Sequence, residues 1–271
     1  MADRTVSFKS RIIEVVLIFD RREILILNTF AMQVTPYKDS DQQKKQQVEQ
    51  MFDNIAPKYD FLNHFLSLGI DKLWRKKAIR ILSGYKSDCL LDVATGTGDF
   101  AIAASKLKPR KITGFDISEQ MLNVARQKVK RLGLDQVIEF QKGDSEAMPF
   151  PDEQFDAITV AFGVRNFENL ENGLKEFFRV LKSEGVVIIL EFSKPKYFPM
   201  KQLYLFYFFG ILPFIGRLVS KDSSAYSYLP ESVMAFPDDQ KFLSVLQRVG
   251  FSQTKQKRLS FGIATIYIAQ K

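Results

Sequence analysis

The sequence predicts an α/β fold: a mostly parallel sheet of seven strands, with helices on both faces and an antiparallel hairpin at the C-terminal end. Two observations predict it. Short, continuously apolar segments alternate with helical segments between residues 90 and 192, which is the pattern of parallel βαβ units. The first apolar segment also ends in a glycine-rich turn that begins a helix. A chain of 271 residues is long enough for one such domain with a small surplus.

Each predicted element rests on its own pattern. Continuous apolar runs fit strands that are buried on both faces, and they predict parallel strands at 90–93, 112–117, 137–141, 155–162 and 186–192. Apolar residues at helical spacing predict helices at 101–107, 121–132, 170–181 and 242–249. Residues 254–260 and 263–269 can then form the hairpin, which turns around Gly262.

Residues 1–36 do not fit this pattern. We expect them to be an N-terminal extension that is disordered or comes from a mis-assigned start, whereas residues 37–271 form the folded domain. Apolar runs at 12–19 and 24–27 are separated by charged residues, and each is too short to span a bilayer. Within the domain, residues 37–85 are interpreted as a helical cap and residues 197–236 as an apolar lid.

Composition excludes several classes of site. The formal charge is +8, but the sequence has neither a run of five or six basic residues nor a nucleic-acid motif, so no nucleic-acid partner is expected. One cysteine and one histidine, Cys89 and His64, exclude an internal disulfide, a cysteine-based zinc cluster and a multi-histidine site. We therefore expect no metal, and we expect a reducing, cytoplasmic compartment.

The turn after the first strand has the Gly-x-Gly-x-x-Ala form of the dinucleotide fingerprint, from Gly96 through Gly98 to Ala101. Glycine has no Cβ, so the backbone can turn sharply and approach a ligand, and the next helix offers free N–H groups. Asp116 ends the second strand, where it can accept hydrogen bonds from the ribose hydroxyls of an adenosine. These features predict a Rossmann-like site for an adenosine-containing cofactor.

Further polar residues narrow the choice of cofactor. Asp92 precedes Gly96 by four positions, where a carboxylate suits the cationic groups of S-adenosylmethionine and would repel a pyrophosphate. Asp144 can accept from the adenine amino group, and Ser145 can add a contact. The spacing favours S-adenosylmethionine, and an NAD-dependent oxidoreductase is the more distant alternative. The predicted cofactor-binding residues are Asp92, Gly96, Thr97, Gly98, Asp116, Asp144 and Ser145.

Five blocks of sequence go beyond the cofactor turn. They are FDNIAPKYD at 52–60, LDVATGTGD at 91–99, AMPFP at 147–151, FGVRN at 162–166 and LEFSKP at 190–195. With these blocks, over about residues 37–270, the chain resembles the ubiquinone/menaquinone biosynthesis C-methyltransferases. The FGVRN and LEFSKP blocks are much more specific than the glycine turn.

The resemblance implies a class I methyltransferase fold and methylation of a polyprenylated quinol ring carbon by S-adenosylmethionine. The acceptor it favours is demethylmenaquinol, in the last step of menaquinone biosynthesis. The benzoquinol precursor of ubiquinone and another small molecule stay open as alternatives. Thr97, Asp116 and the Asp144–Ser145 pair fall on the family's cofactor-contact positions. Some relatives have a serine where Ala161 stands here, so a backbone contact would have to replace its hydroxyl.

The implied reaction needs a carbon nucleophile, which forms when the quinol loses a phenolic proton. Arg165, Asn166 and Tyr59 are the candidate catalytic residues. Arg165 can stabilise a developing phenolate, and Asn166 can orient a water molecule or the ring hydroxyl. Tyr59 and Asp60, from the cap, are expected to close over the site. These residues do not identify the general base, and His64 is interpreted as a packing or surface residue.

An apolar segment at 203–216 has two interpretations. Gly210 and Pro213 interrupt it, so it is either a buried helix pair or a lid that holds a polyprenyl tail. As a lid, residues 197–221 would also make peripheral contact with the inner face of a membrane, because basic residues flank the segment. A homodimer is left open as well.

Overall fold

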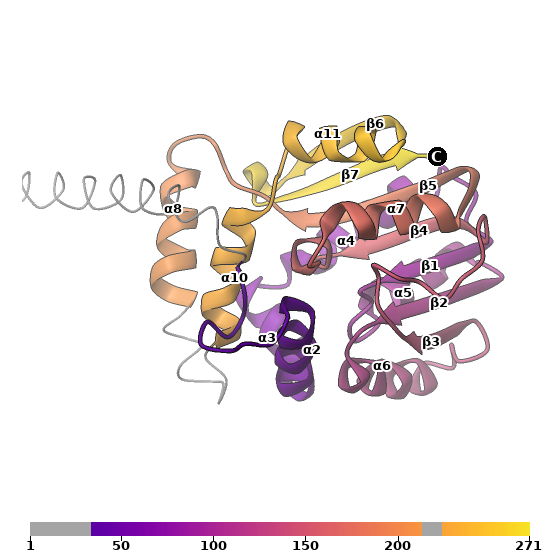
Figure 1. Cartoon of the computed structure of the whole chain (residues 1–271), viewed down its shortest axis with the longest axis horizontal. Coiled ribbons are helices and arrows are strands. Elements are labelled where there is room, and N and C mark those ends of the chain that lie inside the picture. Colours follow the sequence, from indigo (N-terminus) through magenta and orange to yellow (C-terminus); the bar gives the residue numbers. More distant parts are fainter. Residues whose placement is uncertain (1–33, 213–223) are drawn as a thin grey trace, which may run out of the picture. The chain divides into compact units, whose positions relative to one another are not determined.

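The computed structural model describes residues 34–212 and 224–271 (Figure 1). Nearly all of the predicted N-terminal extension, and residues 213–223 of the predicted lid, lie outside the described residues.

The seven predicted strands form one sheet with the order β3-β2-β1-β4-β5-β7-β6. The strands are β1 (Cys89–Val93), β2 (Lys111–Asp116), β3 (Ile138–Lys142), β4 (Phe155–Ala161), β5 (Leu181–Phe192), β6 (Ser252–Leu259) and β7 (Ala264–Gln270). β1 to β5 run parallel, and β7 is antiparallel to both of its neighbours, β5 and β6. The predicted fold class, including the C-terminal hairpin, is confirmed.

Helices cover both faces of the sheet. Helices α4 (Ile70–Leu82) and α5 (Asp99–Ala104) pack on one face, together with Val129 of α6 (Glu119–Arg131). Helices α7 (Leu170–Val180) and α11 (Gln240–Val249) pack on the other. Leu90 and Leu91 belong to opposite clusters, so β1 is buried on both sides, as its apolar residues Leu90, Leu91 and Val93 predict.

Two elements differ from the prediction by more than a shift of one or two residues at their ends. β5 begins at Leu181, because this residue pairs with Phe155 before the register shifts to Ala157 and Val186. The polar residues between Leu181 and Val186 conceal this first part of the strand in the sequence. The helix expected at 101–107 is the α-helix α5 followed by a 3-10 turn, η2 (Ser105–Leu107).

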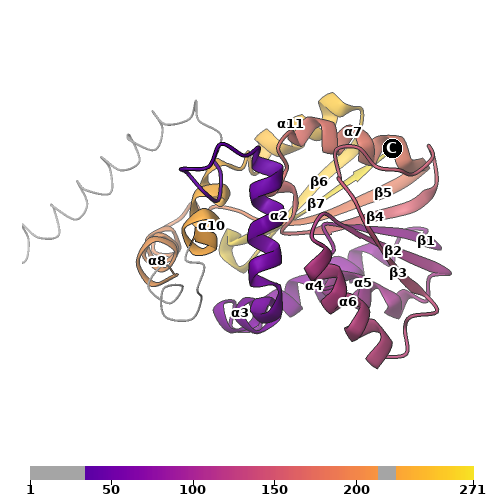
Figure 2. The same ribbon diagram turned by 60° about the horizontal axis from the view of Figure 1, so that its bottom comes forward.

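The cap and the lid are helical. The cap contains α2 (Lys44–Ile55), the 3-10 turn η1 (Ala56–Lys58), α3 (Tyr59–Leu66) and α4, and the described lid contains α8 (Met200–Phe206), a π-helical turn η4 (Tyr207–Ile211) and α10 (Ser224–Ala235). Figures 1 and 2 both show α8 and α10 side by side. Within the described residues, 34–212 and 224–271, no helix has both the length and the apolar character that crossing a bilayer requires.

Candidate functional site

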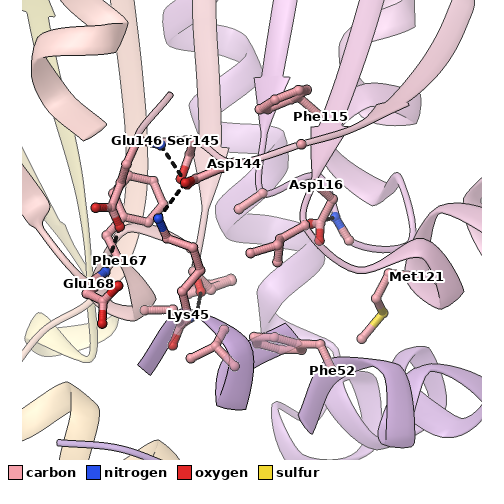
Figure 3. Close-up of a pocket in the computed structure, with 18 of the residues that line it drawn as sticks. Lys45, Phe52, Phe115, Asp116, Met121, Asp144, Ser145, Glu146, Phe167 and Glu168 are labelled. Carbon is pink, nitrogen blue, oxygen red and sulfur yellow. Dashed lines mark hydrogen bonds and ion pairs between the residues drawn. The ribbon is translucent and has the colours of Figure 1, made fainter. Parts of the chain in front are cut away.

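The strand order places β1 between β2 and β4, so the loops that follow these three strands meet at one edge of the sheet. A cleft with about 700 Å³ of empty space, open to solvent, lies at this edge. Figure 3 shows its lining, which comes from the strand ends, from the loop after β3 and from α2. We call it the donor cleft, after the predicted methyl donor. Its lining includes Gly96, Asp116, Asp144, Ser145 and Ala161.

The glycine turn has the geometry that the sequence predicts. Gly96 and Gly98 have φ values of +55° and +81°, in the left-handed region that favours glycine. A Cβ on Gly98 would lie 3.1 Å from the ring of Phe140 and 3.3 Å from Ala125, so the turn packs closely on β3 and α6. Gly96 lines the donor cleft, whereas Gly98 shapes the turn behind it.

The carboxylate of Asp92 faces the protein interior. It is 1% exposed, and it accepts hydrogen bonds from Thr95 Oγ1 at 2.5 Å, Thr159 Oγ1 at 2.6 Å and Ala101 N at 3.1 Å. Burial raises its pKa to about 6, although these three donors act in the opposite direction. The observed contacts hold the glycine turn against β4 and α5. Direct contact between Asp92 and the cofactor stays a prediction.

Asp116 combines a structural and a binding position. Its Oδ2 accepts from Gly96 N at 2.7 Å and its Oδ1 from Ser118 N at 2.9 Å, and burial raises its pKa to about 6. A carboxylate has about four lone-pair sites, so these bonds leave acceptor capacity on the side that lines the cleft. Asp116 therefore fits the ribose-binding role that the sequence predicts.

Asp144 and Ser145 line the cleft after β3, the strand next to the one that Asp116 ends (Figure 3). Asp144 accepts from Glu146 N at 2.9 Å and forms an ion pair with Lys45 of α2 at 2.5 Å. Although partial burial acts against it, the bond to Asp144 raises the pKa of Lys45 above its ordinary value. The cap is thus attached directly to the predicted adenine-binding loop.

A second attachment joins the cap to the glycine turn. The hydroxyl of Thr97 donates to Asp60, and Lys128 of α6 lies 2.7 Å from Asp60 and 2.5 Å from Asp99. Thr97 is 2% exposed and does not line the donor cleft. Its observed role is to hold α3 over the turn, and its cofactor contact stays a prediction.

His64, Asp71 and Asp99 place three possible metal-ligand atoms within 4.8 Å of one another. Arg75 lies 2.5 Å from Asp71 and 3.5 Å from Asp99, and Lys128 also pairs with Asp99. Because two fixed positive charges already neutralise the two carboxylates, this cluster is better described as an ion-pair network that joins α3, α4 and α5.

A larger cavity, the acceptor cavity, lies between the cap and the lid. Its empty space is about 1550 Å³, open to solvent, and its lining is mostly apolar. Trp74 of α4, Phe192 at the end of β5 and Leu229 of α10 are among the lining residues. The volume and the lining suit a large apolar ligand. Leu203, Tyr204 and Leu212 of the apolar segment also line the cavity, and the choice between a buried helix pair and a lid stays a prediction.

The three predicted catalytic residues all line the acceptor cavity. Arg165 is not a surface ion pair: its side chain is 8% exposed, and its Nη1 lies 2.9 Å from Oε1 of Glu191, which is 0% exposed. Burial raises the pKa of Glu191, and Arg165 opposes this shift. Tyr59 and Asn166 line the donor cleft as well as the acceptor cavity.

The sequence carried no signal for the lysines of α2. Lys44 is 9% exposed, its Nζ donates to Phe167 O at 2.8 Å and Arg165 O at 3.5 Å, and burial lowers its pKa to about 8. It therefore attaches the cap to η3 (Val164–Asn166), which carries the catalytic candidates. Lys44 and Lys45 lie in a polar stretch without apolar periodicity, and such a stretch is normally read as solvent-exposed.

The chain is similar in sequence to several named enzymes. The ubiE/COQ5 methyltransferase family matches residues 40–271. A demethylmenaquinone methyltransferase from Bacteroides fragilis is 54% identical over 88% of this chain and 97% of the relative. The same enzyme from Porphyromonas gingivalis is 45% identical over 88% of this chain and 98% of the relative. A ubiquinone/menaquinone biosynthesis C-methyltransferase from Geotalea daltonii is 46% identical over 84% and 98%.

Solved structures share the fold at low identity. A SAM-dependent methyltransferase from Thermotoga maritima, described as a possible histamine N-methyltransferase, has a TM-score of 0.59 at 21% identity, covering 82% of this chain and 99% of its own. The [4+2]-cyclase SpnF has a TM-score of 0.60 at 17% identity, covering 84% and 96%. At these identities the likeness shows the fold alone.

Proposed function

Since the chain belongs to the ubiE/COQ5 methyltransferase family, we propose that it methylates a ring carbon of demethylmenaquinol. The chain is an S-adenosylmethionine-dependent C-methyltransferase of this family. The names of the relatives from Bacteroides fragilis and Porphyromonas gingivalis support the naphthoquinol acceptor. The relative from Geotalea daltonii, whose name covers both quinones, supports the ubiquinone precursor as the second candidate.

One observation carries the proposal: the donor cleft and the acceptor cavity share four lining residues, Phe52, Tyr59, Phe162 and Asn166. Methyl transfer requires the donor methyl group and the acceptor carbon to be held in line at short distance. Two cavities with a common wall support this arrangement. The smaller one, at the sheet edge, has carboxylates such as Asp116 and Asp144 among its lining residues, and the larger one is mostly apolar.

The residues of the donor cleft fit S-adenosylmethionine. Asp116 has spare acceptor capacity for ribose hydroxyls, Gly96 allows close approach of the backbone, and Asp144 offers an acceptor to the adenine amino group. When bound there, S-adenosylmethionine supplies an electrophilic methyl group. The cap, held by Lys45 and Asp60, would exclude water from it.

In the acceptor cavity, the chain must bind the quinol and favour its phenolate form. Arg165 keeps a fixed orientation because Glu191 pairs with it and the carbonyl of Phe162 accepts from it. Its Nε has no hydrogen-bond partner among the described residues and can donate to a phenolate oxygen. Asn166, on the wall shared with the donor cleft, can orient the ring hydroxyl or a water molecule.

A methyl-transfer assay tests the proposal. Purified full-length chain would receive labelled S-adenosylmethionine and chemically reduced demethylmenaquinone, and mass spectrometry would locate the new methyl group. We expect a ring-methylated product from the wild type. Asp116→Ala should lose donor binding and product together, whereas Arg165→Ala should keep donor binding and lose product.

The outcomes separate the two quinols. Donor binding without transfer to demethylmenaquinol would reject the naphthoquinol acceptor, and the benzoquinol precursor of ubiquinone would then be the acceptor to try. Normal turnover by Arg165→Ala would reject Arg165 as a catalytic residue.

We also propose that the lid contacts a membrane surface, where a polyprenylated quinol resides. Tyr197 and Phe198, just before α8, are 80% and 82% exposed, and Phe206 on α8 is 61% exposed. Exposed aromatic residues next to an apolar cavity support entry of the quinol from a bilayer. Lys194 and Lys196 already pair with acidic residues, so apolar insertion rather than charge would dominate.

Flotation with liposomes tests this contact. Wild-type chain should float with the vesicles, and the double variant Phe198→Ser/Phe206→Ser should float less. Leu132→Ser is a matched control, because Leu132 is also exposed (57%) but lies at the end of α6. Wild-type chain that stays unbound, or equal loss in the control, would reject the membrane contact.

A further inference from the structure

Four residues that line the acceptor cavity each carry a buried polar atom that has no hydrogen-bond partner among the described residues. The atoms are Arg165 Nε, Asn166 Oδ1 and the hydroxyl oxygens of Tyr204 and Tyr228. Buried polar atoms are nearly always hydrogen-bonded, because leaving one unpaired costs free energy. Four such atoms, all on residues that line one cavity, therefore indicate a binding site for a polar group.

Tyr204, on α8, is held in place by aromatic packing. It is 5% exposed and stacks on Phe208, with ring centroids 4.2 Å apart. Phe208 contacts the edge of Phe192 at 6.1 Å, and the guanidinium of Arg165 lies over the ring of Phe192 at 5.5 Å. The Tyr204 ring therefore belongs to the same aromatic group that packs against the predicted catalytic arginine.

Tyr228 approaches from the other lid helix, α10, and is 3% exposed. Tyr204, Tyr228 and Arg165 all line the acceptor cavity. Burial raises the pKa of Tyr204 and of Tyr228, and both hydroxyls therefore stay protonated at neutral pH and can donate hydrogen bonds. The lid thus brings two donors to a cavity that is otherwise mostly apolar.

The set of unpaired atoms matches a para-dihydroxylated aromatic ring. Such a ring has two oxygens that accept hydrogen bonds, and each hydroxyl can also donate one. Arg165 and the two tyrosines offer donors, and Asn166 Oδ1 offers an acceptor. We propose that Tyr204 and Tyr228 are substrate-binding residues that hydrogen-bond the ring oxygens of the quinol. This inference rests on the proposed function, and it gives the lid a role in recognising the head group.

The fluorescence of Trp74 provides a binding assay that does not depend on catalysis. Trp74 is the one tryptophan in the sequence, and it lines the acceptor cavity. The full chain would be titrated under nitrogen with para-dihydroxynaphthalene, and in parallel with naphthalene, which has the same rings without oxygens. The comparison isolates the contribution of the ring oxygens. The variants are Tyr204→Phe, Tyr228→Phe and the double variant, which keep the aromatic rings.

Tyr267→Phe is the matched control. Tyr267 is a fully buried tyrosine on β7, and its hydroxyl accepts from Asp239 N at 2.8 Å, but it does not line the acceptor cavity. This control should lower the melting temperature and leave the affinity for the diol unchanged. Tyr204→Phe and Tyr228→Phe should keep or raise the melting temperature, because each removes an unpaired buried hydroxyl.

We expect each lid variant to weaken diol binding about tenfold and to leave naphthalene binding unchanged. Wild-type chain that binds both ligands equally, or lid variants that weaken both ligands equally or neither, would overturn the inference. The methyl-transfer assay reports separately on the proposed function. A wild type that prefers the diol through Tyr204 and Tyr228 but does not methylate demethylmenaquinol would reject the acceptor and keep the two binding residues.

Discussion

Replacing Glu191 with glutamine should destabilise the protein although it changes the shape very little. Glu191 is 0% exposed, and the Arg165 side chain that pairs with it is 8% exposed, so neither charge is well solvated. Glu191→Gln keeps one acceptor oxygen for Arg165 and for the backbone N–H of Phe192, but leaves the guanidinium as an unpaired buried charge. Removing one partner of a buried pair costs about 3–5 kcal/mol. We expect about 3 kcal/mol here, since the amide still accepts a hydrogen bond.

Thermal and denaturant unfolding measure this effect. For a domain of this size, about 3 kcal/mol corresponds to a decrease in melting temperature of about 6–12 °C. The double variant Glu191→Gln/Arg165→Met removes both charges and should recover at least half of the lost stability. The single variant Glu191→Gln should also lower kcat/KM for the quinol about tenfold or more and leave donor affinity unchanged, because the neutral amide holds Arg165 less firmly in its orientation.

Two results would refute this reasoning. A change below about 0.5 kcal/mol in Glu191→Gln would mean that the pair is solvated or uncharged in solution. Additive effects of the two substitutions, with no coupling in the double-mutant cycle, would mean that Glu191 and Arg165 do not interact.

Three further predictions concern the donor cleft. Asp60→Ala should weaken binding of S-adenosylhomocysteine about tenfold in calorimetry, because it releases the cap from the glycine turn. Glu119→Ala, the control, breaks an exposed ion pair and should change neither affinity nor stability by more than about 0.5 kcal/mol. Donor affinity should fall as the pH drops through about 6, because Asp116 becomes protonated there and loses acceptor capacity. Above that pH the affinity should level off. Asp116→Asn should bind the donor weakly at every pH. Gly98→Ala should lower the unfolding free energy by about 2 kcal/mol in denaturant titrations, because of its positive φ and close ring contact, whereas Gly84→Ala should be nearly neutral.

Each of these predictions has a contrary outcome. Unchanged donor affinity in Asp60→Ala would mean that the ion pair does not hold the cap closed. A pH dependence that persists in Asp116→Asn would point to Asp92, the other buried carboxylate of the turn whose pKa is about 6. Wild-type stability in Gly98→Ala would mean that the turn can relax away from Phe140.

Several features of the site could be predicted because they depend on short segments. The glycine turn, the carboxylate at the end of β2 and the loop after β3 each follow a strand whose apolar run is visible in the sequence. Parallel strands then bring their carboxyl ends to one edge of the sheet. For this reason Gly96, Asp116, Asp144 and Ser145 lie together in the donor cleft, as the spacing predicts.

Other features could not be predicted because they depend on packing between distant segments. Nothing in the residues around Asp92 shows that its carboxylate turns inward to Thr159 on β4. Nothing in the residues around Thr97 shows that its hydroxyl donates a hydrogen bond to Asp60 of the cap. In both cases the residue type suits a cofactor contact, and the tertiary structure decides which partner the side chain meets.

The sequence by itself determined the fold class, the sheet edge where the predicted cofactor residues gather, and the family, because apolar periodicity, turn chemistry and motif blocks are local properties of the chain. Only the tertiary structure decided which polar residues line the acceptor cavity. Arg165 meets Glu191 across 26 positions of sequence, and Tyr204 and Tyr228 reach the same cavity from separate helices of the lid. Which buried atoms pair and which stay unpaired depends on how these distant segments pack together.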